Sequence, residues 1–230
     1  MGIRTLILCG GKGTRAWPHT ETVPKPLLDV GGQPAVHHVM EIFARQGFED
    51  FILAAGYRRE ALEEFATTVP WQVEVVDTGD DTNTGGRVLQ CREMLSDPFF
   101  LTYADGLGDV DLPALLAFHQ AHPGLATITT VPLPSAYGTI EFDESGRVSE
   151  FREKPRLPDH YINAGFFVLD AGAFDHWAGD DLERQVLPAL GAAGELYARP
   201  HHGFWKSMDT HKDSLELSAL CAEGTPPWLR

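Results

Sequence analysis

The sequence predicts an α/β fold of the Rossmann-like kind, with a mixed central sheet and a small antiparallel elaboration. Across residues 3–131, short apolar runs alternate with segments in which apolar residues recur every three or four positions. This alternation is typical of strands joined by helices that pack on a sheet. After Pro132 the sequence changes to short strand-like pieces around a turn at 143–146, Asp-Glu-Ser-Gly, which indicates an antiparallel addition.

Each element is expected from its local pattern. Strands are expected in the apolar runs 4–9, 51–55, 72–76, 99–103 and 126–131. Helices are expected where apolar residues are three and four apart, at 35–46, 59–67, 87–95 and 112–119. The second part is expected to add strands at 139–142, 147–151, 162–169, 195–199 and 203–205, and helices at 182–190 and 213–222.

Composition limits the class of protein. A chain of 230 residues that is 43% hydrophobic can bury one sizeable core, so we expect a single domain over 1–230. The net charge of -15 argues against nonspecific nucleic-acid binding. Cys9, Cys91 and Cys221 are too scattered for a disulfide framework or a zinc site, which predicts reduced thiols and a cytoplasmic protein. No apolar run is long enough for a signal peptide or a membrane span.

The first expected strand runs into a glycine-rich loop, Cys9-Gly-Gly-Lys-Gly-Thr-Arg15. Such a loop lets backbone N–H groups approach phosphate oxygens. The same letters satisfy the G-x-G-x-x-A pattern of dinucleotide-binding folds, but Pro18, Pro24 and Pro26 prevent the long helix that this fold requires. A glycine-rich turn without a ligand is the remaining alternative.

Two cations follow within reach of such a loop. Arg15 can bridge the β and γ phosphates of a nucleotide with its forked guanidinium. Lys25 lies between Pro24 and Pro26, so its backbone loses little freedom when it is positioned. Its compact charge suits an α-phosphate at which negative charge develops. We therefore expect Arg15 and Lys25 to be the catalytic cations.

Leu8-Cys-Gly-Gly-Lys-Gly-Thr-Arg15 followed by Pro24-Lys-Pro26 resembles the opening of the sugar nucleotidyltransferases. Further segments resemble the glucose-1-phosphate cytidylyltransferases of that family in order and spacing, at 76–87, 102–106, 153–155, 162–167 and 203–210. The resemblance implies a GT-A-like nucleotidyltransferase fold, with a nucleotide-binding core over 1–131 and a sugar-binding, metal-completing half over 132–230. A shorter segment around 65–73 departs from the subfamily and leaves subunit contacts and base choice open.

The resemblance implies that the protein transfers CMP from CTP to a sugar 1-phosphate, with α-D-glucose 1-phosphate as the expected acceptor, and releases pyrophosphate. UTP or dTTP as the donor, and another phosphorylated or phosphonate acceptor, are alternatives. A nucleotide-sugar glycosyltransferase is a further alternative, because it would use the Asp109-Val-Asp111 triplet for metal. Asp111 is explained more simply as the N-cap of the helix that follows. The resemblance also implies a homo-oligomer.

The resemblance assigns residues to the two substrates and to Mg²⁺. Nucleotide binding is expected from Leu8, Gly10, Gly11, Lys12, Gly13, Thr14, Arg15, Thr82, Gly85, Gly86, Arg87 and Asp105. The stretch from Thr82 to Arg87 differs from the base-reading loop of thymidine- and uridine-using relatives, which favours CTP. Sugar-phosphate binding is expected from Gly138, Glu153, Lys154 and Asn163, although Glu153 and Lys154 could instead form a surface ion pair.

Asp105 is also a candidate metal ligand from its position alone. It follows the expected strand 99–103, and open α/β sheets bind ligands at the carboxyl ends of their strands. A simple turn residue before Gly106 is the alternative. The resemblance pairs Asp105 with Asp209, and two carboxylates with phosphate oxygens and water suit octahedral Mg²⁺.

Overall fold

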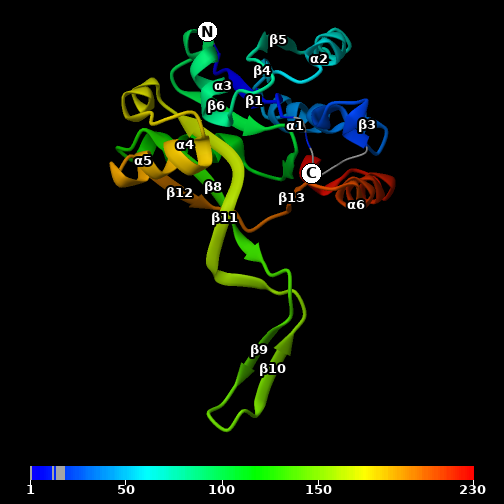
Figure 1. Ribbon diagram of the computed structural model, residues 1–230, viewed down its shortest axis with the longest axis vertical. Helices are drawn as coiled ribbons and strands as arrows, with labels where there is room; N and C mark the ends of the chain where they lie inside the picture. Colours follow the sequence, from blue (N-terminus) through cyan, green and yellow to red (C-terminus); the bar gives the residue numbers. More distant parts are fainter. Residues whose placement is uncertain (1, 12, 14–18) are drawn as a thin grey trace.

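The computed structural model describes residues 2–11, 13 and 19–230 of the chain (Figure 1). Its centre is one seven-stranded sheet in the spatial order β12, β8, β11, β6, β1, β4, β5. In that order the strands are Leu196–Pro200, Ala126–Pro134, Arg156–Leu169, Phe99–Tyr103, Thr5–Leu8, Asp50–Ala55 and Gln72–Asp77. Strands β6, β1, β4 and β5 are mutually parallel, whereas β11 is antiparallel to both of its neighbours. The predicted mixed sheet is therefore confirmed.

Helices cover both faces of this sheet because its strands are apolar on both sides. In β1, Ile7 packs into one buried cluster, and Leu6 and Leu8 pack into the other. The first cluster takes side chains from α1 (Ala35–Ala44), α2 (Arg59–Ala66), α4 (Leu112–Ala121) and α6 (His211–Ala222). The second takes them from α3 (Thr84–Cys91) and α5 (Leu187–Ala192). This two-sided burial is typical of parallel strands and explains why β1, β4 and β6, in the middle of the sheet, lack an exposed polar face.

Some boundaries differ from the expected ones. Helix α3 begins three residues earlier than its apolar pattern suggested, because Thr84 and two glycines form its first turn. Strand β11 begins at Arg156, since its first residues pair with the far end of β8 before the apolar run starts. Two short antiparallel pairs were not expected as pairs, namely β2 (Asp29–Val30) with β3 (Gln33–Pro34), and β7 (Gly106–Gly108) with β13 (Trp205–Ser207).

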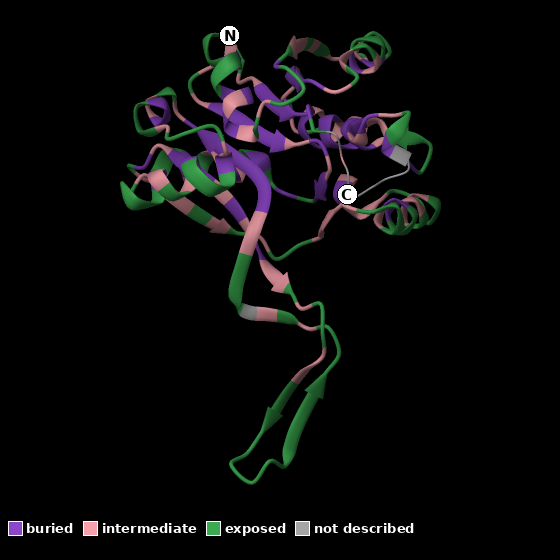
Figure 2. Ribbon diagram, in the orientation of Figure 1, coloured by how far each residue is buried: buried purple, intermediate pink, exposed green. Residues whose placement is uncertain are grey.

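A two-stranded arm, residues 135–155, projects from the end of β8 and β11 (Figures 1 and 2). It consists of β9 (Thr139–Phe142) and β10 (Val148–Arg152), which confirms the expected antiparallel elaboration. Ile140 pairs with Phe151 and Phe142 pairs with Val148, so the four side chains share one face of the ribbon. They are 52%, 60%, 69% and 55% exposed, in that order.

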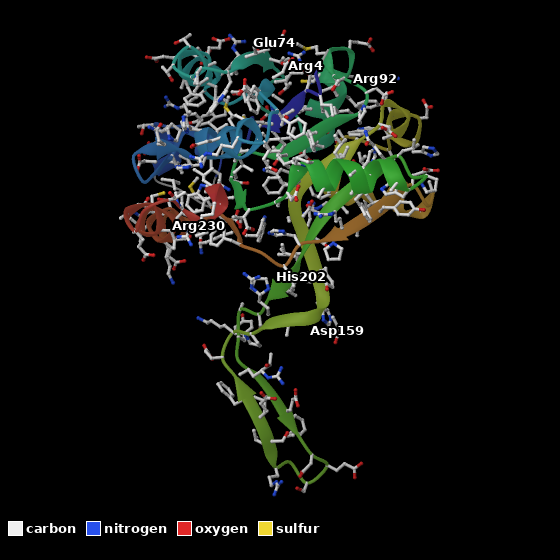
Figure 3. The ribbon with its side chains drawn as sticks, turned by 180° about the vertical axis from the view of Figure 1, so that it is seen from behind. Arg4, Glu74, Arg92, Asp159, His202 and Arg230 are labelled. Atoms are coloured by element: carbon white, nitrogen blue, oxygen red, sulfur yellow. The ribbon has the colours of Figure 1, made fainter. Side chains whose placement is uncertain are left out.

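At the opposite end of the sheet, Arg4, which precedes β1, connects β1 with β4 and β5. Its guanidinium donates to Asp50 Oδ1 at 3.0 Å and to Glu74 Oε2 at 3.1 Å, and Figure 3 shows Arg4 and Glu74 at the end of the molecule away from the arm. Strand β1 therefore starts at the end of the molecule away from the arm, and its carboxyl end points into the molecule toward the arm side. Within the described residues, every helix is too short or too polar to cross a membrane.

Candidate active site

A pocket of about 760 Å³ lies at the carboxyl ends of β1 and β6, where the chain order of the sheet reverses direction. Ligands of doubly wound sheets bind at this kind of position. The described lining comes from both halves of the chain: Leu8, Cys9, Gly10, Gly11, Gly13, Lys25, Pro26, Asp80, Asp81, Thr82, Asn83, Thr84, Arg87, Tyr103, Ala104, Asp105, Gly106, Asn163, Ala164, Glu183, Trp205, Ser207 and Asp209. Most of the described residues expected to bind nucleotide lie in this wall.

Lys25 joins the two aspartates expected to bind metal. Its Nζ lies 2.5 Å from Asp105 Oδ2 and 3.3 Å from Asp209 Oδ1. The lysine side chain is only 13% exposed, whereas the two carboxylates are 26% and 34% exposed. Asp105 and Asp209, which lie far apart in the sequence, therefore direct carboxylate oxygens at one point inside the pocket.

The pairing of β7 with β13 explains how these carboxylates meet. Asp105 immediately precedes β7, and Asp209 lies two residues beyond the end of β13, in which Ser207 pairs with Gly106. The backbone N–H of Met208 donates to Asp105 O at 2.8 Å and extends the pairing. Ser207 Oγ donates to Asp209 Oδ2 at 3.0 Å and leaves Oδ1 directed at Lys25.

The segment that carries Lys25 is fixed from both sides. Lys25 begins a short 3-10 helix, Lys25–Leu27, for which Pro24 is the N-cap. Gly13 has a φ of +60°, and a Cβ at this position would lie 2.7 Å from Lys25 Cβ, so the first loop packs directly on the lysine stem. Thr20 Oγ1 donates to Gly13 O at 3.1 Å, which ties the end of the loop to the same segment.

Arg87 was expected to contact the base, and the structure places its guanidinium under the nucleotide loop. The side chain is buried at 4% exposure. It donates to the carbonyl oxygens of Gly10, Ala55 and Gly79 at 2.8–3.1 Å and to Thr78 Oγ1 at 2.5 Å. Arg87 thus connects the loops that follow β1, β4 and β5, and it still lines the pocket.

Gly85 and Gly86 do not line the pocket, in contrast to Thr82. They form the first turn of α3, where Gly86 N–H donates to Asp180 O at 2.9 Å. A Cβ on Gly85 would lie 3.0 Å from the same carbonyl group, so this glycine permits close backbone packing. The helix starts before these residues instead of after them, and this start turns them away from the pocket. Asn83 and Thr84 occupy the wall in their place.

The residues expected to bind the sugar phosphate are separated. Asn163 lines the pocket, where its Nδ2 donates to Tyr103 Oη at 3.1 Å and its Oδ1 accepts from Gly165 N at 2.7 Å. Gly138, Glu153 and Lys154 lie at the base of the arm and are absent from the described lining. Gly138 and Glu153 are neighbours there, since a Cβ on Gly138 would lie 3.1 Å from Glu153 Oε2.

Three further candidates, Lys12, Thr14 and Arg15, lie outside the described residues. Among the alternatives, Asp111 is the expected N-cap, because its side chain accepts from Ala114 N at 2.9 Å at the start of α4. Asp109 lies 2.9 Å from His201 Nε2 and is absent from the pocket lining. The Asp109-Val-Asp111 triplet therefore belongs to a different place in the fold from Asp105.

The charge of the pocket wall is unusual for an anion-binding site. Its described residues include five carboxylates, Asp80, Asp81, Asp105, Glu183 and Asp209, against two basic side chains, Lys25 and Arg87. Asp80 and Asp81 are exposed residues of the turn that follows β5, and they also belong to this wall. The described part of the wall alone therefore supplies little positive charge for a polyphosphate, and a divalent metal ion beside Asp105 and Asp209 would add to it.

Cys9 lies at the bottom of this pocket, 1% exposed, at the end of β1. Burial raises the pKa of its thiol above the ordinary value, and the negative charge of Asp105 raises it further. The thiol therefore stays protonated at neutral pH and is a poor nucleophile.

Tyr103 and Glu183 are pocket residues that the sequence did not identify. The sequence did not indicate a functional role for Tyr103, because it fits the pattern as the last apolar residue of a strand. Glu183 was hidden because it follows the Asp180-Asp181 pair, which resembles a helix N-terminus, and Asp181 is indeed a cap that accepts from Arg184 N at 2.8 Å. Acidic residues in a first helical turn are common, so the pattern alone carried no functional signal.

Comparison with known proteins finds a matching family and full-length relatives. The model of a family described as nucleotidyl transferase matches residues 4–223. Glucose-1-phosphate cytidylyltransferase of Salmonella typhi is 35% identical, in an alignment that covers 98% of each chain. Mannose-1-phosphate guanylyltransferase 1 of Arabidopsis thaliana is 34% identical over 92% of this chain and 62% of its own length.

Solved structures show the same fold. The crystal structure of HddC from Yersinia pseudotuberculosis superposes with a TM-score of 0.74 at 21% identity and covers 95% of this chain and 99% of that one. A second structure of HddC, complexed with GMP-PN, gives a TM-score of 0.72 at 20% identity, with the same coverage. At these identities the likeness concerns the architecture alone.

Proposed function

Because this chain belongs to the nucleotidyl transferase family, we propose that it transfers CMP from CTP to α-D-glucose 1-phosphate and releases pyrophosphate. The cytidylyltransferase of Salmonella typhi, whose name states this activity, supports the proposal because the alignment spans 98% of both chains. The observation that carries the proposal is the meeting of Lys25, Asp105 and Asp209 in one pocket behind a glycine-rich loop.

In this proposal a phosphate oxygen of the sugar 1-phosphate attacks the α-phosphorus of CTP in line, and pyrophosphate leaves. No covalent protein intermediate is required, and the buried, protonated Cys9 does not offer a nucleophile. The protein contributes positioning and charge stabilisation. Lys25 provides a preorganised cation near the α-phosphate, and the backbone of Gly10, Gly11 and Gly13 leaves room for phosphate oxygens.

Nucleotidyltransferases of this family generally use a divalent metal ion, and we propose Mg²⁺ for this chain. The residues present fit this ion, since Asp105 and Asp209 are hard oxygen donors whose carboxylates converge from two segments. When bound, Mg²⁺ would neutralise charge on the phosphates. The excess of carboxylates over basic side chains in the described wall supports a role for a metal ion, which would offset the charge of Asp105 and Asp209.

Individual binding roles remain part of the proposal. Thr82 and Arg87 line the pocket and are proposed to contact the nucleotide, and Asn163, which also lines it, is proposed to bind the sugar. Glu153 and Lys154 are proposed to bind the sugar and its phosphate from the base of the arm. Alanine in place of Lys154 should raise the KM for glucose 1-phosphate more than the KM for CTP, because only the first substrate would lose its cation.

The test of the proposed function is a matrix of four nucleoside triphosphates against glucose, mannose and galactose 1-phosphates, with pyrophosphate release as the readout. CTP with glucose 1-phosphate and Mg²⁺ should give the highest kcat/KM, and removal of the metal with EDTA should abolish turnover. A preference for UTP or dTTP would refute the donor, and a preference for another sugar would refute the acceptor. Absence of pyrophosphate from every pair would refute the reaction.

The matrix is combined with one substitution. Lys25→Ala should lower kcat about a hundredfold or more, as expected when one preorganised electrostatic group is lost. Lys212→Ala is the matched control, because its side chain is 83% exposed on α6 and should leave kcat unchanged. Wild-type turnover in Lys25→Ala would remove this lysine from the mechanism.

We also propose that the protein is a homo-oligomer, supported by the exposed apolar face of the arm, which nothing in the same chain covers among the described residues. A surface of this kind on a projecting ribbon is typical of contacts between chains. The three free thiols support the proposal of a cytoplasmic location.

A further inference from the structure

The carboxylate of Glu183 receives hydrogen bonds from both walls of the pocket. One oxygen accepts from Tyr103 Oη, and the other accepts from Thr84 Oγ1 at 2.7 Å. Tyr103 comes from the central strand β6, and Thr84 is the first residue of α3. Glu183 therefore connects the nucleotide-side helix with the strand that precedes Asp105, although its own segment begins about 100 residues later in the chain.

The directions of these bonds are determined by chemistry. An ionised carboxylate only accepts, so Tyr103 must donate its one hydroxyl hydrogen to Glu183. The phenol oxygen can then only accept from Asn163 Nδ2, at 3.1 Å. Asn163 Oδ1 is already held by Gly165 N–H at 2.7 Å, which fixes which end of the amide faces Tyr103. One of the two Nδ2 hydrogens is used, and no acceptor among the described residues takes the other, which leaves it for a ligand in the pocket.

The local backbone is built to allow this arrangement. Gly165 has a φ of +80°, and a Cβ there would lie 2.5 Å from Tyr103 Cδ2, so the tyrosine ring occupies the space that a side chain would fill. Glu183 is the second residue of a π-helical turn, Leu182–Val186, a rare geometry that is frequent at functional sites. Leu182 N–H donates to Thr84 Oγ1 at 3.0 Å, which fixes the hydroxyl that Glu183 uses.

We propose that Glu183 is a positioning residue that, through Tyr103, aims the Asn163 amide at the hydroxyl groups of the acceptor sugar. This inference rests on the proposed function. The chain Gly165, Asn163, Tyr103, Glu183 has one donor and one acceptor at each link, so loss of the final acceptor frees the tyrosine hydroxyl to rotate.

The two substrates should respond differently to the same substitution. Glu183→Ala and Tyr103→Phe should each raise the KM for glucose 1-phosphate about tenfold, the effect of one mispositioned hydrogen bond, with the KM for CTP changed less than about threefold. The double variant should be no worse than either single variant, because both act on one chain of bonds. Glu183→Gln should restore most of the affinity for the sugar, since its amide oxygen can still accept from Tyr103.

Two controls isolate this effect. Thr84→Val removes the nucleotide-side bond to Glu183 and should change the KM for CTP more than the KM for glucose 1-phosphate. Arg184→Ala lies on the same turn with a side chain that is 88% exposed, and it should match wild type in both constants. Calorimetric titration with glucose 1-phosphate, and thermal unfolding of every variant, accompany the kinetics so that misfolding is recognised.

The outcomes separate the inference from the proposed function. Equal increases in both KM values, no increase in either, or additive effects in the double variant would overturn the role of Glu183 while wild-type activity upholds the reaction. A wild-type protein that turns over no pair of nucleotide and sugar 1-phosphate, and binds no sugar 1-phosphate in the calorimeter, would overturn both. The tenfold change in one KM with rescue by glutamine supports both.

Discussion

At the scale of the residue, the position of the Arg87 side chain requires glycine at position 10. A Cβ on Gly10 would lie 1.9 Å from Arg87 Nη1 and 2.0 Å from its Cζ, which is far inside van der Waals contact. The guanidinium cannot retreat, because it is buried and bonded to three loops. Gly10→Ala should therefore lower the free energy of unfolding by about 2–3 kcal/mol, through strain and lost buried hydrogen bonds. Urea denaturation would measure this difference.

Gly11 provides the matched control in the same loop. A Cβ on Gly11 meets no atom of the described residues within 4 Å, and its φ does not require glycine. Gly11→Ala should leave the free energy of unfolding unchanged within about 0.5 kcal/mol. Equal losses in the two variants would show that the loop tolerates no side chain at all, and that Arg87 is not the cause.

The sequence could identify those pocket residues that stand in a short, recognisable sequence pattern. Lys25 between two prolines and Asp105 after an apolar strand both carry such a pattern, and the structure places them 2.5 Å apart. Glu183 has no local pattern, since its partners Tyr103 and Thr84 are 80 and 99 residues away. Arg87 could be identified as a basic residue after two glycines. Its burial could not be predicted, because it depends on three loops that come together only in the folded protein.

At the scale of the element, two histidines at the end of α4 share one hydroxyl group. His119 Nδ1 lies 2.9 Å and His122 Nε2 lies 2.7 Å from Thr127 Oγ1. Gly124 N–H donates to His122 Nδ1 at 3.1 Å, so that nitrogen must carry no hydrogen. Protonation of His122 would place a hydrogen against the Gly124 N–H and break this contact. The arrangement therefore requires neutral His122.

This requirement predicts how stability depends on pH. Burial lowers the pKa of His122 below its ordinary value, and His119 lowers it further. The unfolded chain binds a proton near pH 6.5, where the folded protein does not, so the free energy of unfolding should fall as pH decreases from about 7 to 5.5. The slope from one such group is at most about 1.4 kcal/mol per pH unit.

Chemical denaturation at several pH values would check this prediction with two variants. His122→Gln should reduce the slope, because the group that titrates is gone. His202→Gln should keep the wild-type slope, since His202 is exposed on the side of the molecule that faces the arm (Figure 3). An unchanged slope in His122→Gln would show that another histidine, such as His37, whose pKa burial also lowers, accounts for the dependence.

Elements were predictable where burial repeats along one segment. Strand β6 matches its expected range, Phe99–Tyr103, because four of its five residues are buried on alternating faces of the sheet. The pairing of β7 with β13 was not predictable, since each strand has three residues and the partners lie about 100 residues apart. That pairing brings Asp105 and Asp209 together, so the sequence identified Asp209, and its meeting with Asp105, only by resemblance.

At the scale of the whole molecule, the sheet unites the two halves of the sequence. Strands β8, β11 and β12 extend the sheet that begins with β1, so no sheet boundary separates residues 1–131 from 132–230. The pocket likewise takes Lys25 and Thr82 from the first half and Asn163 and Asp209 from the second. The arm is the part of the chain that projects away from the sheet and the helices packed on it (Figure 2).

The arm is the part of the molecule on which we expect its assembly to depend. Its apolar face, formed by Ile140, Phe142, Val148 and Phe151, is more than half exposed at every position. A two-stranded ribbon is marginal in water on its own, so covering this face by a second copy of the chain would stabilise both. Phe142→Ser with Phe151→Ser should therefore convert the proposed oligomer to monomers at micromolar concentration, as measured by light scattering after size exclusion.

The opposite face of the ribbon supplies the control. Glu141 and Arg152 lie on that face, 3.3 Å apart, and their side chains are 66% and 50% exposed. Glu141→Ala with Arg152→Ala removes this pair and should leave the mass of the assembly unchanged, because exposed ion pairs contribute little free energy. A wild-type protein that is monomeric at every concentration, or an oligomer that survives serine at both phenylalanines, would show that the arm does not join the subunits. Loss of the oligomer in the serine variant alone would assign the contact to one face of one hairpin.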